Sequence, residues 1–256
     1  MISRRTWGSW TAACVVLVGA VAWVGIVATT HGLEMDGRFD TGSLGVFLPV
    51  WVVMMAAMMF PSVWPSVLVH RRVLMGRRRA GRVSGGSTTA FMGGYLASWG
   101  TYGVAAFALL VVASAAFGGL SDSEAARYVV APAALIGAGY QVTPLKVACL
   151  RHCQGPLAFF VRHWRDGLAG SFRLGFRHGG YCVGCCWAEM LFLLSVGVMS
   201  LAWMVIVAAA IAVEKFSWKA RTWVRYGLAA ALIAIAALAA LDPSTLPGFG
   251  GNSMSM

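Results

Sequence analysis

The sequence predicts an all-α fold, a polytopic bundle of about six transmembrane helices with one amphipathic interfacial helix. Of its 256 residues, 59% are apolar and only 11% are charged, and the mean hydropathy is +0.74. A soluble domain has about 25% charged residues and could not bury this much apolar surface. The 31 glycines and 11 tryptophans are typical of packed membrane helices and of the headgroup level. The composition therefore indicates one integral membrane domain over residues 1–256.

Five or six stretches are long and apolar enough to cross a bilayer, which takes about 20 residues. We expect spans over about 10–29, 45–69, 91–113, 128–150, 181–213 and 224–241. The first follows Arg4 and Arg5, as in a twin-arginine export signal, but its apolar run exceeds the core of about 7–15 residues in such signals. We therefore favour a retained helix over a cleaved signal. Pro144 should kink the fourth span.

The stretch 181–213 is too long for one upright crossing. It forms either one steeply tilted helix or a hairpin near Gly197, and we favour the tilted helix, which gives six crossings. By contrast, residues 156–178 alternate aromatic side chains with arginines and histidines. This pattern predicts a helix lying on the membrane surface.

The formal charge of +11 comes from basic residues in short gaps between the apolar spans, at 71–82 and 146–177. Such gaps lie on the cytoplasmic side, which also places the N-terminus there. Acidic residues cluster in the gaps after the first and third spans, which we expect outside. Because the basic residues are explained by orientation, nucleic-acid binding is not expected. Basic residues around Glu214 contradict a simple six-span count, so the side of the C-terminus stays open.

Four methionines, Met54, Met55, Met58 and Met59, lie within about 140° of one helix circumference. Their thioethers are neutral in lipid and bind Cu(I) without losing a proton. Methionine is also an adaptable core residue, so packing is the competing interpretation.

Five of the six cysteines lie between positions 149 and 186, in two motifs that also contain His152 and His178. Cysteines on the reducing cytoplasmic side favour metal ligation over structural disulfides. The spacing matches no zinc finger, and it could form a thiolate site for zinc, an iron–sulfur cluster or Cu(I). The candidate ligands in this segment are Cys149, His152, Cys153, His178, Cys182, Cys185 and Cys186.

Glu189 lies inside an expected span, where an unpaired charge would cost a few kcal/mol. It must be protonated, paired or metal-bound. Lys146 is a candidate proton or ion partner, although a lysine near a helix end can instead extend to the headgroups, which we slightly favour. Glu214 and Lys215 are interpreted as an interface boundary.

Several of these motifs, spread over residues 50–215, are similar to those of an uncharacterised bacterial family of predicted metal-binding integral membrane proteins. The matching pieces are Met54-Met55-Ala-Ala-Met58-Met59 with Pro61-Ser62, Tyr140-Gln141 with Thr143-Pro144-Leu145-Lys146, Cys149-Leu-Arg-His-Cys153, His178-Gly-Gly-Tyr-Cys182-Val-Gly-Cys185-Cys186-Trp187, and Glu214-Lys215. The resemblance implies metal binding in the bacterial inner (cytoplasmic) membrane, without giving the metal.

The leading hypothesis is handling of a transition metal, with copper favoured and zinc or iron as alternatives, by transport, delivery or storage. The expected partners are the bilayer and the ion, and a metallochaperone or membrane-complex partner could exchange it. The sequence contains no Gly-x₄-Gly-Lys-Ser/Thr loop, so ATP-driven pumping is not expected. The alternatives are a thiol–disulfide oxidoreductase using Cys149/Cys153 and Cys182/Cys185, and a non-catalytic assembly subunit. An enzymatic activity is not favoured.

Overall fold

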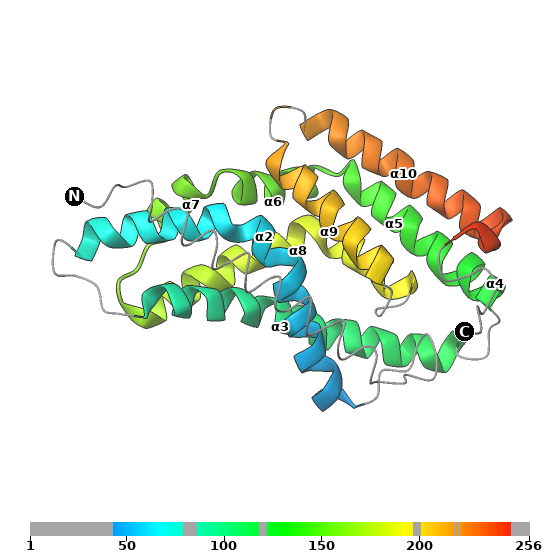
Figure 1. Cartoon of the computed structure of the whole chain (residues 1–256), viewed down its shortest axis with the longest axis horizontal. Helices are drawn as coiled ribbons and strands as arrows, with labels where there is room; N and C mark the ends of the chain where they lie inside the picture. The colour runs from blue at the N-terminus through cyan, green and yellow to red at the C-terminus, as the bar shows by residue number, and fades with distance from the viewer. Residues whose placement is uncertain are drawn as a thin grey trace. The chain divides into compact units, whose positions relative to one another are not determined.

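The computed structural model describes residues 43–78, 86–117, 122–196, 201–217, 219 and 221–246, and these form helices and no strands (Figure 1). The predicted all-α fold is therefore confirmed for this part of the chain. The expected first span, 10–29, lies outside the described residues. The helices are α2 (Leu44–Arg78), α3 (Ser87–Phe117), α4 (Asp122–Ala125), the π-helix η1 (Ala126–Val130), α5 (Ala131–Gln141), α6 (Pro144–Gln154), α7 (Pro156–His163), α8 (Gly167–Val196), α9 (Leu201–Phe216), α10 (Arg221–Leu241) and the 3₁₀ turn η2 (Pro243–Thr245).

Four described helical stretches are long and apolar enough to cross a membrane: 44–76 of α2, α3, α8 and 222–241 of α10. A fifth candidate is the bent pair Ala126–Gln141 and Pro144–Gln154, whose two parts meet at 71°. These helices are compatible with membrane insertion. The total of six crossings stays a prediction.

The bend follows from Pro144, which the sequence indicated. Proline has no backbone N–H to donate, and its ring disfavours helical conformation in the residue before it. The helix α5 ends at Gln141, where the N–H of Val142 turns back to the carbonyls of Gly139 and Tyr140, and α6 begins at Pro144. The expected single span 128–150 is thus two helices.

The expected interfacial helix 156–178 also differs from the structure. The helix α7 ends at His163, Trp164 is extended, and Gly167 has a φ of +87°, which glycine adopts without a Cβ clash. Only α7 keeps the amphipathic pattern as a separate helix, with Phe159 and Phe160 buried. The remaining residues belong to the long helix α8.

The stretch 181–213 is not one tilted helix. The helix α8 ends at Val196 and α9 begins at Leu201. The rings of Phe192 and Trp203 lie 5.3 Å apart, edge to face, which eleven residues of continuous helix would not allow. The two helices therefore pack side by side, as the hairpin alternative requires, while Gly197 itself lies outside the described residues.

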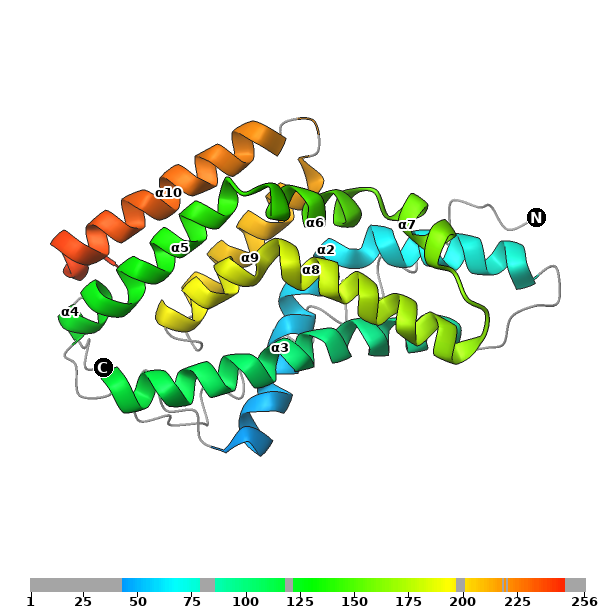
Figure 2. The same cartoon turned by 180° about the vertical axis from the view of Figure 1, so that it is seen from behind.

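The chain contacts divide the molecule into two compact units. Among the described residues, the first unit contains those within 43–105 and 147–185, and the second those within 106–146 and 186–246. In the first unit, Trp51 of α2 donates its ring N–H to the carbonyl of Trp99 on α3, at 3.1 Å. In the second, α10 lies along α5, as both views show (Figures 1 and 2).

Candidate metal centre

Three cysteine sulfurs converge in the first unit. The Sγ atoms of Cys153 on α6 and of Cys182 and Cys185 on α8 all lie within 4.8 Å of one another. The Sγ atoms of Cys153 and Cys185 are 3.9 Å apart. Cys182 and Cys185 are buried, each 1% exposed, and Cys153 is half-buried. We call these three residues the cysteine triad. Among the described residues, these are the three potential metal ligands whose ligand atoms lie close enough together to hold one ion.

Helix geometry explains this convergence. Cys182 and Cys185 are three residues apart on α8, so they share a face. Gly184 allows α6 to come close, because a Cβ built on it would lie 2.8 Å from the Sγ of Cys149. The thiol of Cys185 also donates to the carbonyl of Cys182, at 3.1 Å, which fixes its rotamer.

Tyr95 adds a hydrogen-bonding group beside the triad. Its hydroxyl lies 3.1 Å from the Sγ of Cys182. The helices α3 and α8 approach closely here, since a Cβ on Gly179 would lie 2.7 Å from the Cβ of Ser98. Glycine and serine residues on α3, such as Ser98, allow such close packing. Nothing in the sequence, however, connects Tyr95 with a cysteine 87 residues away.

Two predicted cysteine ligands lie apart from the triad. The Sγ of Cys149 faces the backbone of Gly184, and the residue is half-buried. Cys186 is buried and belongs to the second unit. Helix phase explains the position of Cys186, because neighbouring positions on α8 point about 100° apart.

The two predicted histidines have other surroundings in the first unit. The ring of His152 stacks on Tyr181 at a centroid distance of 4.1 Å, and its Nδ1 lies 2.8 Å from the carbonyl of Ala148. His178 is buried among aromatic rings, with Phe160 at 5.5 Å. Neither belongs to the triad.

His70 is a buried histidine that the sequence did not single out. Its ring stacks on Phe91 at 4.7 Å, with Trp164 at 5.2 Å. Both ring nitrogens are buried, and neither has a hydrogen-bond partner among the described residues. The neighbouring Arg71-Arg72 pair predicts membrane orientation and gives no sign of this aromatic surrounding.

The four methionines lie on α2 in the first unit and are all buried, from 0% to 3% exposed. The hydroxyl of Ser62, one turn further, donates to the carbonyl of Met59 at 2.9 Å. Their thioethers thus face protein, which suits either a sulfur-lined path or a packed core.

The second unit contains an ion network instead. Lys146 is completely buried, and its ammonium group pairs with Glu189 and, at 2.8 Å, with Glu214. The amide of Gln141 donates to Oε1 of Glu189 at 2.8 Å. Lys146 therefore does not extend to the headgroups, and Glu214 is a buried partner instead of an interface boundary. The physical reason is that two buried carboxylates stabilise a buried ammonium that would otherwise require water.

Arg225 of α10 completes the polar part of this unit. Its guanidinium donates to the carbonyl of Gln141, at 2.7 Å from Nε, and to that of Thr143, at 3.4 Å. These carbonyls lie at the break before Pro144, where regular helical hydrogen bonds end. The basic residues that contradicted the six-span count thus include one with a structural role.

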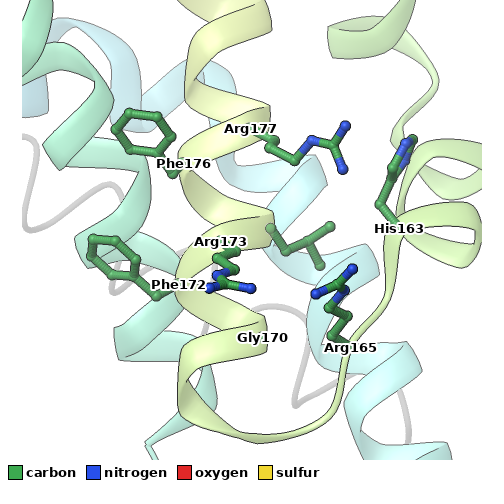
Figure 3. Close-up of a pocket in the computed structure, with 8 residues that line it drawn as sticks. His163, Arg165, Gly170, Phe172, Arg173, Phe176 and Arg177 are labelled. Carbon is green, nitrogen blue, oxygen red and sulfur yellow. The ribbon is translucent and has the colours of Figure 1, made fainter.

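A basic cavity of about 390 Å³ lies beside α8 in the first unit (Figure 3). Arg165, Arg177 and His163 point toward the same space, while Phe172 and Phe176 extend from the opposite side of the helix. Among the described residues that line the cavity, none is acidic. This combination of arginines and exposed phenylalanines is typical of a membrane interface.

Comparison with protein-family models found that residues 48–239, three quarters of the chain, match a family described as copper chaperone, PpoB2. The chain belongs to this family. Neither the curated proteins nor the solved structures contain a match. Family membership and the cysteine triad together indicate copper handling, in agreement with the metal-binding family expected from the motifs.

Proposed function

For this member of a copper-chaperone family, we propose a multi-pass membrane protein that binds Cu(I) through Cys153, Cys182 and Cys185 and exchanges it with a partner. The convergence of three sulfurs from two helices is the observation that supports this most directly. The Cu(I) ion is cargo here, so the site must bind it and also release it.

The donor set favours Cu(I) over zinc. Metal–thiolate bonds are about 2.3 Å long, so three sulfurs around one ion in a plane lie about 4 Å from one another. The separation of 3.9 Å between Cys153 and Cys185 fits this spacing. Structural zinc sites take four protein ligands, and the triad offers three soft ones.

Tyr95 and the half-buried Cys153 suggest how the site is tuned and reached. A tyrosine hydroxyl that donates to the Cys182 sulfur would stabilise its thiolate form, which is the form that binds a metal. Because Cys153 is the least buried of the three, we propose that copper enters and leaves on its side.

The four methionines would provide weaker, neutral sulfur ligands for the ion along α2. Thioethers keep no charge when the ion leaves, which suits a path through apolar helices. A membrane location is supported by the four long apolar helices. We place the arginine-rich segments 71–82 and 151–177, and the N-terminus, on the cytoplasmic side of a bacterial inner membrane. A metallochaperone or a membrane-complex partner would exchange copper there.

The test is metal stoichiometry of the purified full chain after anaerobic loading with Cu(I). We expect one tightly bound copper, lost in the single variants C153S, C182S and C185S. The matched controls are C149S and C186S, which alter cysteines outside the triad and should retain the ion. Equal copper content in all five variants would exclude the triad as the site. Preferential retention of zinc would exclude Cu(I) as the ion that the site binds.

A thiol–disulfide oxidoreductase is a second candidate, because Cys153 and Cys185 have sulfurs only 3.9 Å apart. The structure favours this pair over the pairs expected from sequence spacing. Against the idea, Cys185 is buried, whereas a nucleophilic thiolate must be accessible. Alkylation before and after mild oxidation decides between them: selective loss of labelling at Cys153 and Cys185 supports redox exchange.

A further inference from the structure

We propose that the basic cavity of the first unit binds the phosphate group of an anionic phospholipid. The cavity has a volume of about 390 Å³ and is lined by residues from the end of α7 and the first turns of α8. Its lining has a cationic part, with Arg165, Arg173 and Arg177, and an apolar part that includes Phe172 and Phe176. The inference rests on the membrane location in the proposed function and is independent of copper binding.

Local helix geometry brings the three arginines of the cavity together. Arg173 and Arg177 are four residues apart on α8, so they lie on one face of this helix. Arg165 approaches from the connection before Gly167, and Figure 3 shows it directed toward the same space as Arg177. Gly170 allows this connection to lie against α8, because a Cβ there would clash with the carbonyl oxygen of Arg165. The fold itself therefore builds the cationic part.

The positive charge of the cavity is not balanced by nearby acids. No salt bridge joins any of its three arginines to another residue in the described part of the chain. Asp166, the acid next to Arg165 in sequence, does not line the cavity and accepts a hydrogen bond from the ring N–H of Trp164 at 2.8 Å. Like charges that surround one cavity repel one another and attract an anion.

A phosphate group suits the donors of this cavity. The guanidinium of arginine binds phosphate oxygens through two parallel hydrogen bonds. A phosphodiester has one negative charge and two free oxygens, so two guanidinium groups can share it. His163 points toward the same space, and its Nδ1 donates to the carbonyl of Phe159 at 3.0 Å, which holds the ring in place. Together these side chains form a set of donors for one phosphate group.

The surface beside the cavity indicates the bilayer as the source of this phosphate. The helix α8 is long and apolar enough to cross a membrane, and the cavity lies at its first turns. Leu168, Phe172 and Phe176 recur every four residues on α8 and are 41% to 50% exposed, so they form an apolar stripe. Acyl chains can cover this stripe while the neighbouring arginines contact the headgroup. Basic pockets on the cytoplasmic side, where we place this segment, bind anionic headgroups.

The experiment is a lipid titration of the purified, copper-free full chain, followed by native mass spectrometry, which resolves each bound lipid. The probes are phosphatidylglycerol, which has a net negative charge, and phosphatidylcholine with the same acyl chains, which is neutral overall. We expect one phosphatidylglycerol to bind more tightly than phosphatidylcholine and to resist displacement by inorganic phosphate. Displacement by an equal concentration of inorganic phosphate would overturn the lipid as the source, and equal binding of the two lipids would overturn the site.

Two matched variants locate the site. R165Q/R177Q removes two exposed arginines of the cavity and should weaken phosphatidylglycerol binding about 30-fold, which corresponds to about 1 kcal/mol for each arginine. The control R151Q/R162Q removes two exposed arginines that line a neighbouring cavity, and it should retain most of the affinity. Equal losses in both variants would show that net charge alone attracts the lipid and would overturn the site. Circular dichroism checks the fold, and the wild-type comparison of the two lipids needs no variant.

The lipid site and the proposed function can fail separately. An alkaline wash of cell membranes tests the membrane location, because an integral protein stays in the pellet. A chain released by the wash would overturn this location and, with it, the bilayer as the source of the ligand. A chain that stays in the membrane and binds Cu(I), but does not prefer phosphatidylglycerol, would retain the proposed function and overturn the lipid site.

Discussion

The two units both bury reactive side chains among apolar helices, but they differ in how these side chains are made compatible with burial. The first unit gathers sulfur atoms and aromatic rings, which carry little charge and need few partners. The second gathers one ammonium, two carboxyl groups and an amide, each held by the others. A soft ligand can be removed from the first without leaving a buried charge behind. In the second, removal of one member leaves the other charged groups buried without a partner, which costs free energy.

The largest effect of a single substitution on copper binding is expected at the triad. C182S should lower Cu(I) affinity by more than the 10- to 100-fold typical of losing a residue that only hydrogen-bonds to a metal ligand, because a ligand itself is removed. The unfolding free energy of the copper-free protein should change little. Competition with a Cu(I) chelator measures the affinity, and a fully retained affinity would contradict the assignment.

At the ion network the effect should fall on stability instead. K146M leaves two buried acids without their ammonium and should destabilise the protein by about 3–5 kcal/mol. Chemical unfolding in detergent measures this, with copper stoichiometry per folded molecule unchanged. The triple variant K146M/E189Q/E214Q should recover much of the loss, because it contains no unpaired charge. Equal destabilisation of both variants would show that packing, and not charge, determines the stability.

A smaller effect on copper binding is expected at Tyr95. Y95F removes the hydroxyl beside Cys182 and leaves the ring, so Cu(I) affinity should fall by about 10-fold. A change in stability without a change in affinity would assign Tyr95 a packing role.

The smallest effect is expected at Cys149. C149S should change copper affinity by less than about 2-fold, since its sulfur lies at Gly184 and outside the triad. G184A would place a methyl group 2.8 Å from that sulfur, so the Cys149 side chain must shift, at a cost of about 1 kcal/mol or less. A large loss of copper in C149S would enlarge the site to four thiolates and reopen zinc as the ion.

The sequence by itself determined the helical fold, the kink at Pro144 and the segment that contains the candidate metal ligands. These follow from local rules: apolar run length, the missing N–H of proline, and the clustering of cysteines within 149–186. The end of α7 at His163 could not be predicted from the sequence. The positive φ of Gly167, where the chain turns, is not visible in the sequence, because glycine adopts many backbone conformations.

Only the tertiary structure decided which of the clustered residues act together. Cys149 and Cys153 lie one turn apart on the same face of α6, yet only Cys153 belongs to the triad, whereas the sulfur of Cys149 lies at Gly184. Lys146 and Glu214 are 68 positions apart, so no periodicity could pair them. Local patterns fix which residues are helical and apolar, whereas long-range packing selects the partners, because contact depends on the rotation and crossing of helices that the sequence order does not contain.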